Sequence, residues 1–262
     1  MGSAERCNEE REQNMQHLKD RWVLVTGASR GLGQLIAIFM AEQGCHLILH
    51  GRGIKNLENT AEAVKKYNRK VHMVSCELSD LTAVDGMLQS IDSLGVDVDV
   101  IFNNAGYQIG YHENYYNTPD DDFVVSYKIN TVAPIKICYH FLPKMTERGF
   151  GRIINTTSDI ANEPQQAGDS ASKAALDKQT VDLAGKLTGS GVTLNLMNPS
   201  WCQTDLGGPF APHKPESTLP GLALPAFSSD KVNGQRINAQ EYRDMTLSDA
   251  LGKLENSSVC FL

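Results

Sequence analysis

Short runs of apolar and β-branched residues alternate with longer helical patterns along most of this chain. A strand that leads through a helix to the next parallel strand produces this alternation, so it predicts repeated β-α-β units around one sheet. The predicted strands are residues 22–25, 46–49, 71–74, 98–102, 152–155 and 192–196, with a weaker seventh at 234–238. The predicted helices are residues 32–43, 54–67, 80–93, 119–147 and 169–188. We therefore expect an α/β fold with a doubly wound parallel sheet of about seven strands.

The length of 262 residues suits one domain, and the chain shows no internal repeat and no linker. We expect a flexible, charged arm at residues 1–20, one Rossmann-like domain at 21–240, and a tail with one short helix at 241–262. Pro134 falls inside the predicted helix 119–147 and should bend it, because proline lacks the amide hydrogen that a helix needs.

Charge and composition exclude several classes of function. The net charge is −7 and no stripe of Lys and Arg is present, which argues against a nucleic-acid partner. No stretch approaches the roughly twenty apolar residues of a membrane span, and residues 1–20 lack the apolar core of a signal peptide. The six cysteines are too scattered for a metal site. We therefore expect a cytoplasmic protein with free thiols, no disulfide, no bound metal and no membrane partner.

A glycine-rich turn, Thr26-Gly27-Ala28-Ser29-Arg30-Gly31-Leu32-Gly33, joins the first predicted strand to the first predicted helix. Gly27, Gly31 and Gly33 let the backbone turn tightly and bring bare N–H groups and a helix N-terminus against a pyrophosphate. Such a turn alone is a weak signal, but the strand before it and the helix after it strengthen the prediction. The chain is therefore predicted to bind a dinucleotide.

Further motifs accompany this turn. They are Asn103-Asn104-Ala105-Gly106 after the fourth predicted strand, Asn130 in the long helix, Ser158 after the fifth strand, Ser170-Ala171-Ser172-Lys173, and Asn198-Pro199-Ser200-Trp201-Cys202-Gln203-Thr204 after the sixth. With the spacing Thr-Gly-x-x-x-Gly-x-Gly, they resemble the short-chain dehydrogenase/reductase family from about Trp22 to Ala239. The resemblance implies an oxidoreductase that interconverts a ketone and a secondary alcohol and assembles as a homodimer or homotetramer.

The residues at the end of the second predicted strand indicate which dinucleotide is bound. NAD-preferring proteins of this kind place a carboxylate there to bind the ribose hydroxyls, whereas this chain has Gly51 and Arg52. Arg30 inside the turn adds a second guanidinium, and forked guanidinium donors suit phosphate oxygens. Two solvated surface arginines are the alternative. We predict NADP(H).

The resemblance implies a set of cofactor-binding residues: Gly27, Ser29, Arg30, Gly31, Leu32, Gly33, Arg52, Glu77, Leu78, Asn104, Ala105, Gly106, Lys173, Pro199 and Thr204. Glu77 stands where an acidic residue contacts adenine, and Thr204 where a hydroxyl holds the nicotinamide carboxamide. The usual Pro-Gly before that threonine reads Pro199-Ser200 here, which makes the loop stiffer.

The resemblance also implies catalytic residues, and one of them departs from the family pattern. Asn130, Ser158 and Lys173 match, but the position of the proton-donating tyrosine, four residues before Lys173, holds Asp169. An aspartic acid has a pKa of about 3.9, so keeping it protonated at neutral pH costs on the order of 4 kcal/mol. A neighbouring ammonium and a helix N-terminus favour its charged form. We expect Asp169 to be an acceptor that forms an ion pair with Lys173.

Three explanations of Asp169 stay open. It is an inactivating change, natural or engineered. Alternatively, water or another side chain supplies the proton, and Tyr107, Tyr111, Tyr115, Tyr116 and Tyr127 include candidates. Finally, the protein is a non-catalytic NADP(H)-binding sensor or partner subunit. A hydrolase that uses Ser158 is disfavoured, because no G-x-S-x-G motif surrounds this serine.

Two segments are expected to surround the substrate. Residues 107–117 are rich in tyrosine and follow the fourth predicted strand, at the edge of the sheet where ligands bind. They suit an aromatic or sugar-like carbonyl or alcohol substrate. Residues 205–228 contain five prolines and would form the opposite wall. The apolar residues Ile129, Val132, Ile135 and Ile137 belong either to a subunit interface or to the core.

Overall fold

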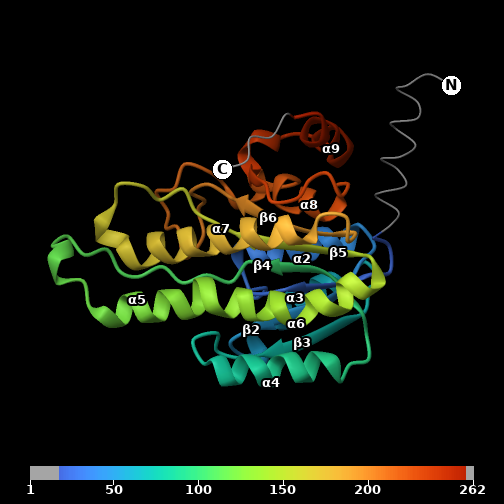
Figure 1. Cartoon of the computed structure of the whole chain (residues 1–262), viewed down its shortest axis with the longest axis horizontal. Coiled ribbons are helices and arrows are strands. Elements are labelled where there is room, and N and C mark those ends of the chain that lie inside the picture. The colour runs from blue at the N-terminus through green and yellow to red at the C-terminus, as the bar shows by residue number, and fades with distance from the viewer. Residues whose placement is uncertain (1–17, 258–262) are drawn as a thin grey trace.

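The computed structural model describes residues 18–257, and its strands form a single parallel sheet in the order β3-β2-β1-β4-β5-β6-β7 (Figure 1). The strands are β1 (Trp22–Val25), β2 (His46–Gly51), β3 (Val71–Ser75), β4 (Val98–Asn103), β5 (Gly151–Thr156), β6 (Val192–Asn198) and β7 (Arg236–Asn238). The chain starts in the middle of the sheet, builds outward to β3, and then returns to continue on the other side of β1. This is the doubly wound order, so the predicted fold and strand number are confirmed.

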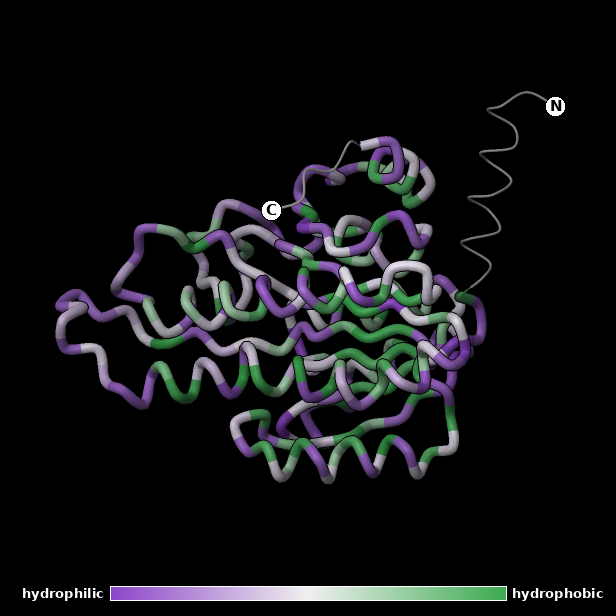
Figure 2. Tube along the Cα trace, in the orientation of Figure 1, coloured by the Kyte–Doolittle hydropathy of each residue, from purple (hydrophilic) through white to green (hydrophobic). Residues whose placement is uncertain are grey.

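Helices cover both faces of the sheet. They are α2 (Gly31–Glu42), α3 (Glu58–Lys65), α4 (Leu81–Asp92), α5 (Asp120–Tyr127), α6 (Ala133–Arg148), α7 (Ala167–Leu187), α8 (Leu224–Phe227) and α9 (Leu247–Asn256). Helices α2, α3, α8 and α9 pack into one apolar core, and α4 and α6 into the other. In Figure 2 the central strands are largely hydrophobic, whereas α4 alternates between hydrophobic and hydrophilic turns. Strands buried on both faces explain the continuous apolar runs of the sequence.

The long helix predicted at residues 119–147 is present in three parts. Helix α5 leads into a π-helical turn, η3 (Lys128–Val132), and α6 follows it. Pro134 lies in the first turn of α6 and has no amide hydrogen to donate to the Asn130 carbonyl. The predicted interruption of the helix at Pro134 takes the form of a widened turn that directly precedes the proline and contains Asn130. Such turns are frequent at functional sites.

The ends of the described chain pack onto the domain. Leu18, in the predicted arm, is buried against the same core as α2, and residues 1–17 lie outside the described residues. In the predicted tail, Ala250, Leu251 and Leu254 of α9 are buried in that core.

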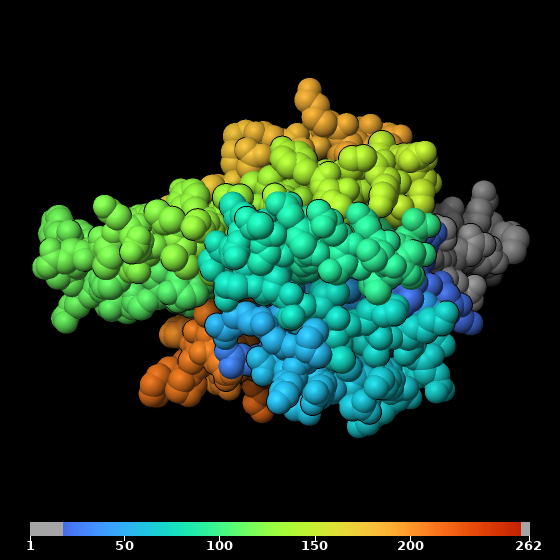
Figure 3. All heavy atoms as spheres, turned by 90° about the horizontal axis from the view of Figure 1, so that it is seen from below, coloured from blue at the N-terminus to red at the C-terminus, as the bar shows by residue number. Residues whose placement is uncertain are grey.

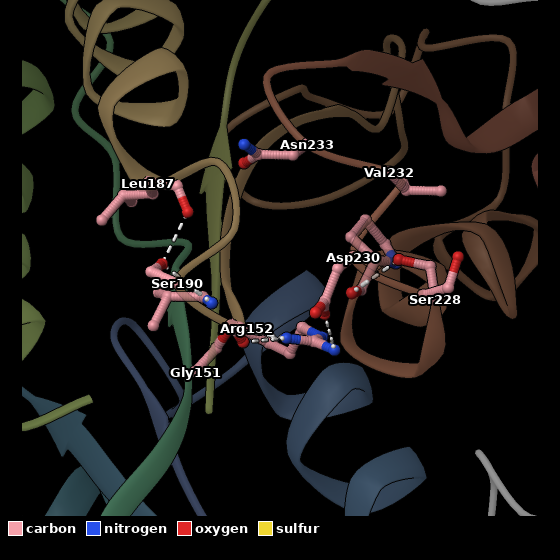
Figure 4. Close-up of polar contacts among 12 residues, drawn as sticks. Gly151, Arg152, Leu187, Ser190, Ser228, Asp230, Val232 and Asn233 are labelled. Carbon is pink, nitrogen blue, oxygen red and sulfur yellow. Dashed lines mark hydrogen bonds and ion pairs between the residues drawn. The ribbon is translucent and has the colours of Figure 1, made fainter. Parts of the chain in front are cut away.

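A buried arginine ties β5 to the segment before β7, at the edge of the sheet opposite to the glycine-rich turn (Figure 4). Arg152 donates to the backbone carbonyls of Gly151 and Gly191 at 3.0 and 2.9 Å, and forms an ion pair with Asp230 at 2.8 Å. The Arg152 guanidinium also lies 4.6 Å from the ring centroid of Phe150. These contacts pair both terminal nitrogens of the guanidinium, while its Nε has no hydrogen-bond partner among the described residues, and we assign Arg152 a structural role.

Candidate functional site

The glycine-rich turn lies at the carboxyl end of β1, in the middle of the sheet. Gly27 and Gly31 have φ angles of +68° and +56°, which residues other than glycine rarely adopt. A Cβ atom on Gly33 would lie 2.2 Å from the Gly27 carbonyl oxygen and 2.6 Å from Nδ2 of Asn104. The first two glycines are therefore required by backbone conformation, and the third by the close approach of the helix start to the turn.

Hydrogen bonds fasten this turn to the segment after β4. The Thr26 hydroxyl accepts from the backbone amides of Asn104 and Ala105, both at 3.0 Å, and donates to the Phe102 carbonyl at 3.3 Å. The Asn104 side chain donates to the Thr26 carbonyl at 3.1 Å. Two of the motifs that the sequence places far apart thus meet at one edge of the sheet.

The predicted cofactor residues around the turn differ in exposure. Arg30 and Arg52 are exposed, and the Arg30 guanidinium forms an ion pair with Asp205 at 2.9 Å. Glu77 is also exposed, whereas Leu78 is buried. Ser29 and Leu32 are half-buried in the turn itself.

The segment after β6 reaches back to the turn. The Thr204 side chain lies 3.5 Å from the position that a Cβ atom on Gly31 would take. Ser200, which follows the half-buried Pro199, has a φ angle of +60°. This left-handed conformation is strained for serine and suits glycine, so the departure from Pro-Gly noted in the sequence has a conformational cost.

Asn130 is fully buried and connects several parts of the site. Its side-chain oxygen accepts from the Tyr107 amide at 2.8 Å, and its Nδ2 donates to the Tyr107 carbonyl at 2.8 Å. The same Nδ2 lies 3.0 Å from Oδ1 of Asp169 and 3.0 Å from the Ser172 hydroxyl. The π-helical turn therefore presents Asn130 to both the segment after β4 and the start of α7.

Lys173 is buried on α7, and its ammonium donates to the Thr156 carbonyl at the end of β5, at 2.7 Å. A Cβ atom on Gly106 would lie 3.7 Å from this ammonium and 3.7 Å from the Asn130 side-chain oxygen. Burial lowers the pKa of Lys173, and the carboxylates of Asp169 and Asp177 act in the opposite direction. Asn130, Lys173 and Gly106, three of the residues singled out in the sequence, thus lie close together.

Asp169 is only 5% exposed and does not form the predicted ion pair with Lys173. That prediction is wrong because the lysine side chain extends to the end of β5 instead. Burial raises the pKa of Asp169 above its ordinary value, while Lys173 and the hydrogen bond from Asn130 lower it. The sequence argument weighed the ammonium but could not include the loss of solvent.

Ser158 is half-buried just after β5, and its hydroxyl accepts from the Ile160 amide at 3.3 Å. Its backbone carbonyl accepts from the Arg236 guanidinium at 2.8 Å. Arg236 also forms ion pairs with Asp159 at 2.5 Å and with Asp177 at 3.5 Å. The hydrogen bonds and ion pairs of the described residues connect Ser158 to α7 through this arginine.

The sequence from residue 21 to residue 215 matches the family model of the short chain dehydrogenases. The chain belongs to the short-chain dehydrogenase family. It is 29% identical over 243 residues to a fatty acyl-CoA reductase of Acinetobacter baylyi, with 91% of this chain and 79% of that protein covered. It is 29% identical over 192 residues to the NADPH-dependent reductase BacG of Bacillus subtilis, with 72% and 73% covered.

One of the similar solved structures is a complex with bound small molecules. The L-sorbose reductase of Gluconobacter frateurii, complexed with NADPH and L-sorbose, is 25% identical, with a TM-score of 0.66 and coverage of 74% of this chain and 72% of that one.

In this short-chain dehydrogenase, the segment from Tyr107 to Thr118 projects from the molecule beside the site, within the green region on the left of Figure 3. His112 joins it to its neighbours: its ring lies 2.6 Å from the Asp122 carboxylate, and its amide donates to the Gln165 carbonyl at 3.1 Å. Tyr111 and Tyr116 are exposed on this segment. The tyrosine-rich segment and η4 (Pro164–Gln166), which directly precedes α7, therefore form one continuous wall.

Three charged residues of this short-chain dehydrogenase were missed in the sequence. Asp177 could have been found, because it follows Lys173 by four residues and so lies on the same face of α7. The sequence does not indicate Arg236 and Asp205, because each contacts residues that are distant in the chain and that only the fold brings close.

Two structural features are absent from residues 18–257. No helix in this range is long and apolar enough to cross a membrane. Nor does this range contain a group of three or more His, Cys, Asp or Glu side chains arranged to hold a metal ion.

Proposed function

We propose that this protein is an NADP(H)-dependent oxidoreductase that interconverts a carbonyl compound and an alcohol. The observation that carries the proposal is the position of Lys173 and Asn130 beside Gly106, directly next to the glycine-rich turn that Thr26 fastens to β4. Bare backbone amides and positive φ angles in the turn leave room for a pyrophosphate at the start of α2. A bound nicotinamide dinucleotide would supply hydride transfer.

The preference for NADP(H) rests on charge. Gly51 and Arg52 end β2 without a carboxylate, and Arg30 and Arg52 are both exposed and able to reach a phosphate. BacG is named as NADPH-dependent and the L-sorbose reductase binds NADPH, which supports the same choice for this chain. Glu77 and Leu78 would border the adenine, and Thr204 with Pro199 the nicotinamide.

The roles of the catalytic residues follow from their contacts. Ser158 would donate a hydrogen bond to the substrate oxygen, Lys173 would bind the nicotinamide ribose, and Asn130 would hold the backbone of Tyr107 and a relay water. Asp169 occupies the position of the proton donor. Because it accepts a hydrogen bond from Asn130 and has a shorter side chain than tyrosine, we propose that ketone reduction is weak in this chain.

The substitution Asp169→Tyr tests this function. NADPH consumption is followed for both forms over a panel of aromatic and sugar-like ketones. A rate gain of at least about tenfold in the variant would support a reductase weakened by Asp169. If neither form reduces any ketone although both bind NADPH, the alternative of a non-catalytic NADP(H)-binding sensor or partner subunit is favoured, since the buried carboxylate at the donor position also fits a binding protein.

We also propose that the protein acts in the cytoplasm as a homodimer or homotetramer. Val132 is exposed on η3, and Val124 of α5 and Tyr139 of α6 are exposed as well. Ile137, the other end of the predicted apolar set, is buried in the core beneath. The exposed residues are available to a second subunit. A light-scattering mass equal to that of the 28.7 kDa chain would contradict the assembly.

A further inference from the structure

The charged side chains around Lys173 form a cluster with an excess of negative charge. Lys173 lies between Asp169 and Asp177, one helical turn before and after it on α7. Arg236 is the second cation of this cluster. Asp159, which pairs with Arg236, is its third carboxylate. Counted with all groups ionised, three carboxylates face two cations, which leaves a net charge of −1.

The wall around this cluster has the same sign. Residues 107–127 contain four acidic side chains and no Lys or Arg, and residues 158–172 contain three and no Lys or Arg. The seven are Glu113, Asp120, Asp121, Asp122, Asp159, Glu163 and Asp169. The contact between the His112 amide and the Gln165 carbonyl joins the two segments. The two segments of this wall therefore carry more carboxylates than cations, even when Lys128 and Lys173, which directly follow them, are counted.

Asp169 is the most buried of these carboxylates, and the hydrogen bond from Asn130 and the charge of nearby Lys173 stabilise its charged form only in part. It is 5% exposed, accepts from Asn130 in the bonds of the described residues, and does not form an ion pair with Lys173. The Asn130 Nδ2 has two hydrogens but three acceptors, namely Asp169, Ser172 and the Tyr107 carbonyl. A buried carboxylate with one shared hydrogen bond gains free energy from a cationic neighbour.

A carboxylate at this position suits an electrophile that is already positively charged. Reduction of a ketone produces an alkoxide, which needs an acid. Reduction of an iminium ion produces a neutral amine and needs none. We propose that the electrophile which this oxidoreductase site reduces best is an iminium ion or a protonated imine rather than a neutral carbonyl, with Asp169 as the counterion that holds its nitrogen near the nicotinamide.

The proposed reaction balances without a proton donor from the protein. The iminium carbon gains a hydride, the electron pair of the C=N π bond moves to nitrogen as a lone pair, and the nicotinamide that supplies the hydride is oxidised. Asp169 attracts the positive nitrogen before the transfer and neither gives nor takes a proton in the step. Exposed tyrosine rings on residues 107–117 could add cation–π attraction at the entrance.

The inference rests on the proposed NADP(H) function, so NADPH binding is measured first and separately by fluorescence titration. NADPH consumption is then followed with cyclic iminium ions of increasing size, namely N-methyl pyrrolinium, tetrahydropyridinium and dihydroisoquinolinium, each paired with the neutral ketone of the same skeleton. The rate without enzyme is subtracted, and amine products are identified by mass spectrometry. We expect at least one iminium ion to react about tenfold faster, or more, than its paired ketone.

The isosteric variant Asp169→Asn removes the charge and keeps the shape. It should lower kcat/KM for the iminium ion about tenfold or more and leave the NADPH dissociation constant within about twofold. Binding of the saturated N-methyl amine cation to the complex with NADP+, measured by calorimetry, should weaken by a similar factor, and Asp169→Glu should retain part of it.

Two outcomes would overturn the inference. One is NADPH binding without faster reduction of any iminium ion than of its ketone. The other is an Asp169→Asn protein that reduces iminium ions and binds the amine cation as well as the unaltered protein. Failure of NADPH to bind would instead remove the proposed function itself, and with it the inference.

Discussion

The side-chain Nδ2 of Asn130 lies 3.0 Å from the Asp169 carboxylate, so the π-helical turn and the first turn of α7 are joined through this hydrogen bond. Burial raises the pKa of this carboxylate, with Lys173 and Asn130 as opposing influences. The site thus retains its amide and its ammonium but has a carboxylate with little solvent.

The substitution Asp169→Asn should change how stability depends on pH. The pKa of Asp169 in the folded protein is raised above its ordinary value of 3.8, so the folded state binds the proton more tightly than the unfolded chain. The stability that Asp169 contributes is therefore fully present below pH 3.8 and is lost as the pH rises through the folded pKa. The free energy of unfolding of the native protein relative to Asp169→Asn should fall over that range.

Urea unfolding of both proteins at several pH values measures this difference, with the exposed Asp121→Asn as a control for the removal of a carboxylate. If the free energy of unfolding relative to Asp169→Asn instead rises with pH, the neighbouring cation and amide lower the pKa of Asp169 by more than burial raises it.

The substitution Gly33→Ala should abolish dinucleotide binding. The new Cβ atom would stand 2.2 Å from the Gly27 carbonyl oxygen, so the turn must open, at a cost of about 1–3 kcal/mol in stability. Gly86→Ala is the matched control, because Gly86 is an exposed glycine within α4 with no atom within 4 Å of its Cβ position. The control should stabilise the protein by about 0.5–1 kcal/mol and bind NADPH normally. Equal NADPH affinity in both variants would show that this turn is not the site.

The substitution Asp205→Asn should tighten the binding of NADPH but not of NADH. Asp205 pairs with Arg30 at 2.9 Å and so competes with a 2′-phosphate for the guanidinium. Both side chains are well exposed, and such pairs contribute up to about 1 kcal/mol, which corresponds to a gain of at most about fivefold. Parallel titrations with the two cofactors test it. The same gain for both cofactors would mean that Arg30 does not contact the 2′-phosphate.

The substitution Arg152→Met should destabilise the fold by about 2–4 kcal/mol without changing NADPH affinity. It removes the donors to the Gly151 and Gly191 carbonyls and the ion pair with Asp230 (Figure 4). Lys178→Met, which removes an exposed lysine from α7, is the control and should change stability by less than about 0.5 kcal/mol. Chemical denaturation of the two variants decides between a structural Arg152 and a dispensable one.

The sequence was informative where local pattern determines structure. Apolar runs located every strand, and the glycine turn lies between β1 and α2 as predicted. It failed where distant segments meet: the Lys173 side chain reaches Thr156 rather than Asp169, and Arg236 reaches Ser158 from β7. The widening of the helix at Asn130 was likewise beyond a periodicity argument, because Pro134 predicts a disturbance but not its form.

Titration of the purified protein with NADPH and with NADH, followed by cofactor fluorescence, tests the central claim most directly. With Arg30 and Arg52 beside a turn that has no acidic neighbour at the end of β2, NADPH should bind at least about tenfold more tightly than NADH. Tighter binding of NADH, or no binding of either cofactor, would contradict the account.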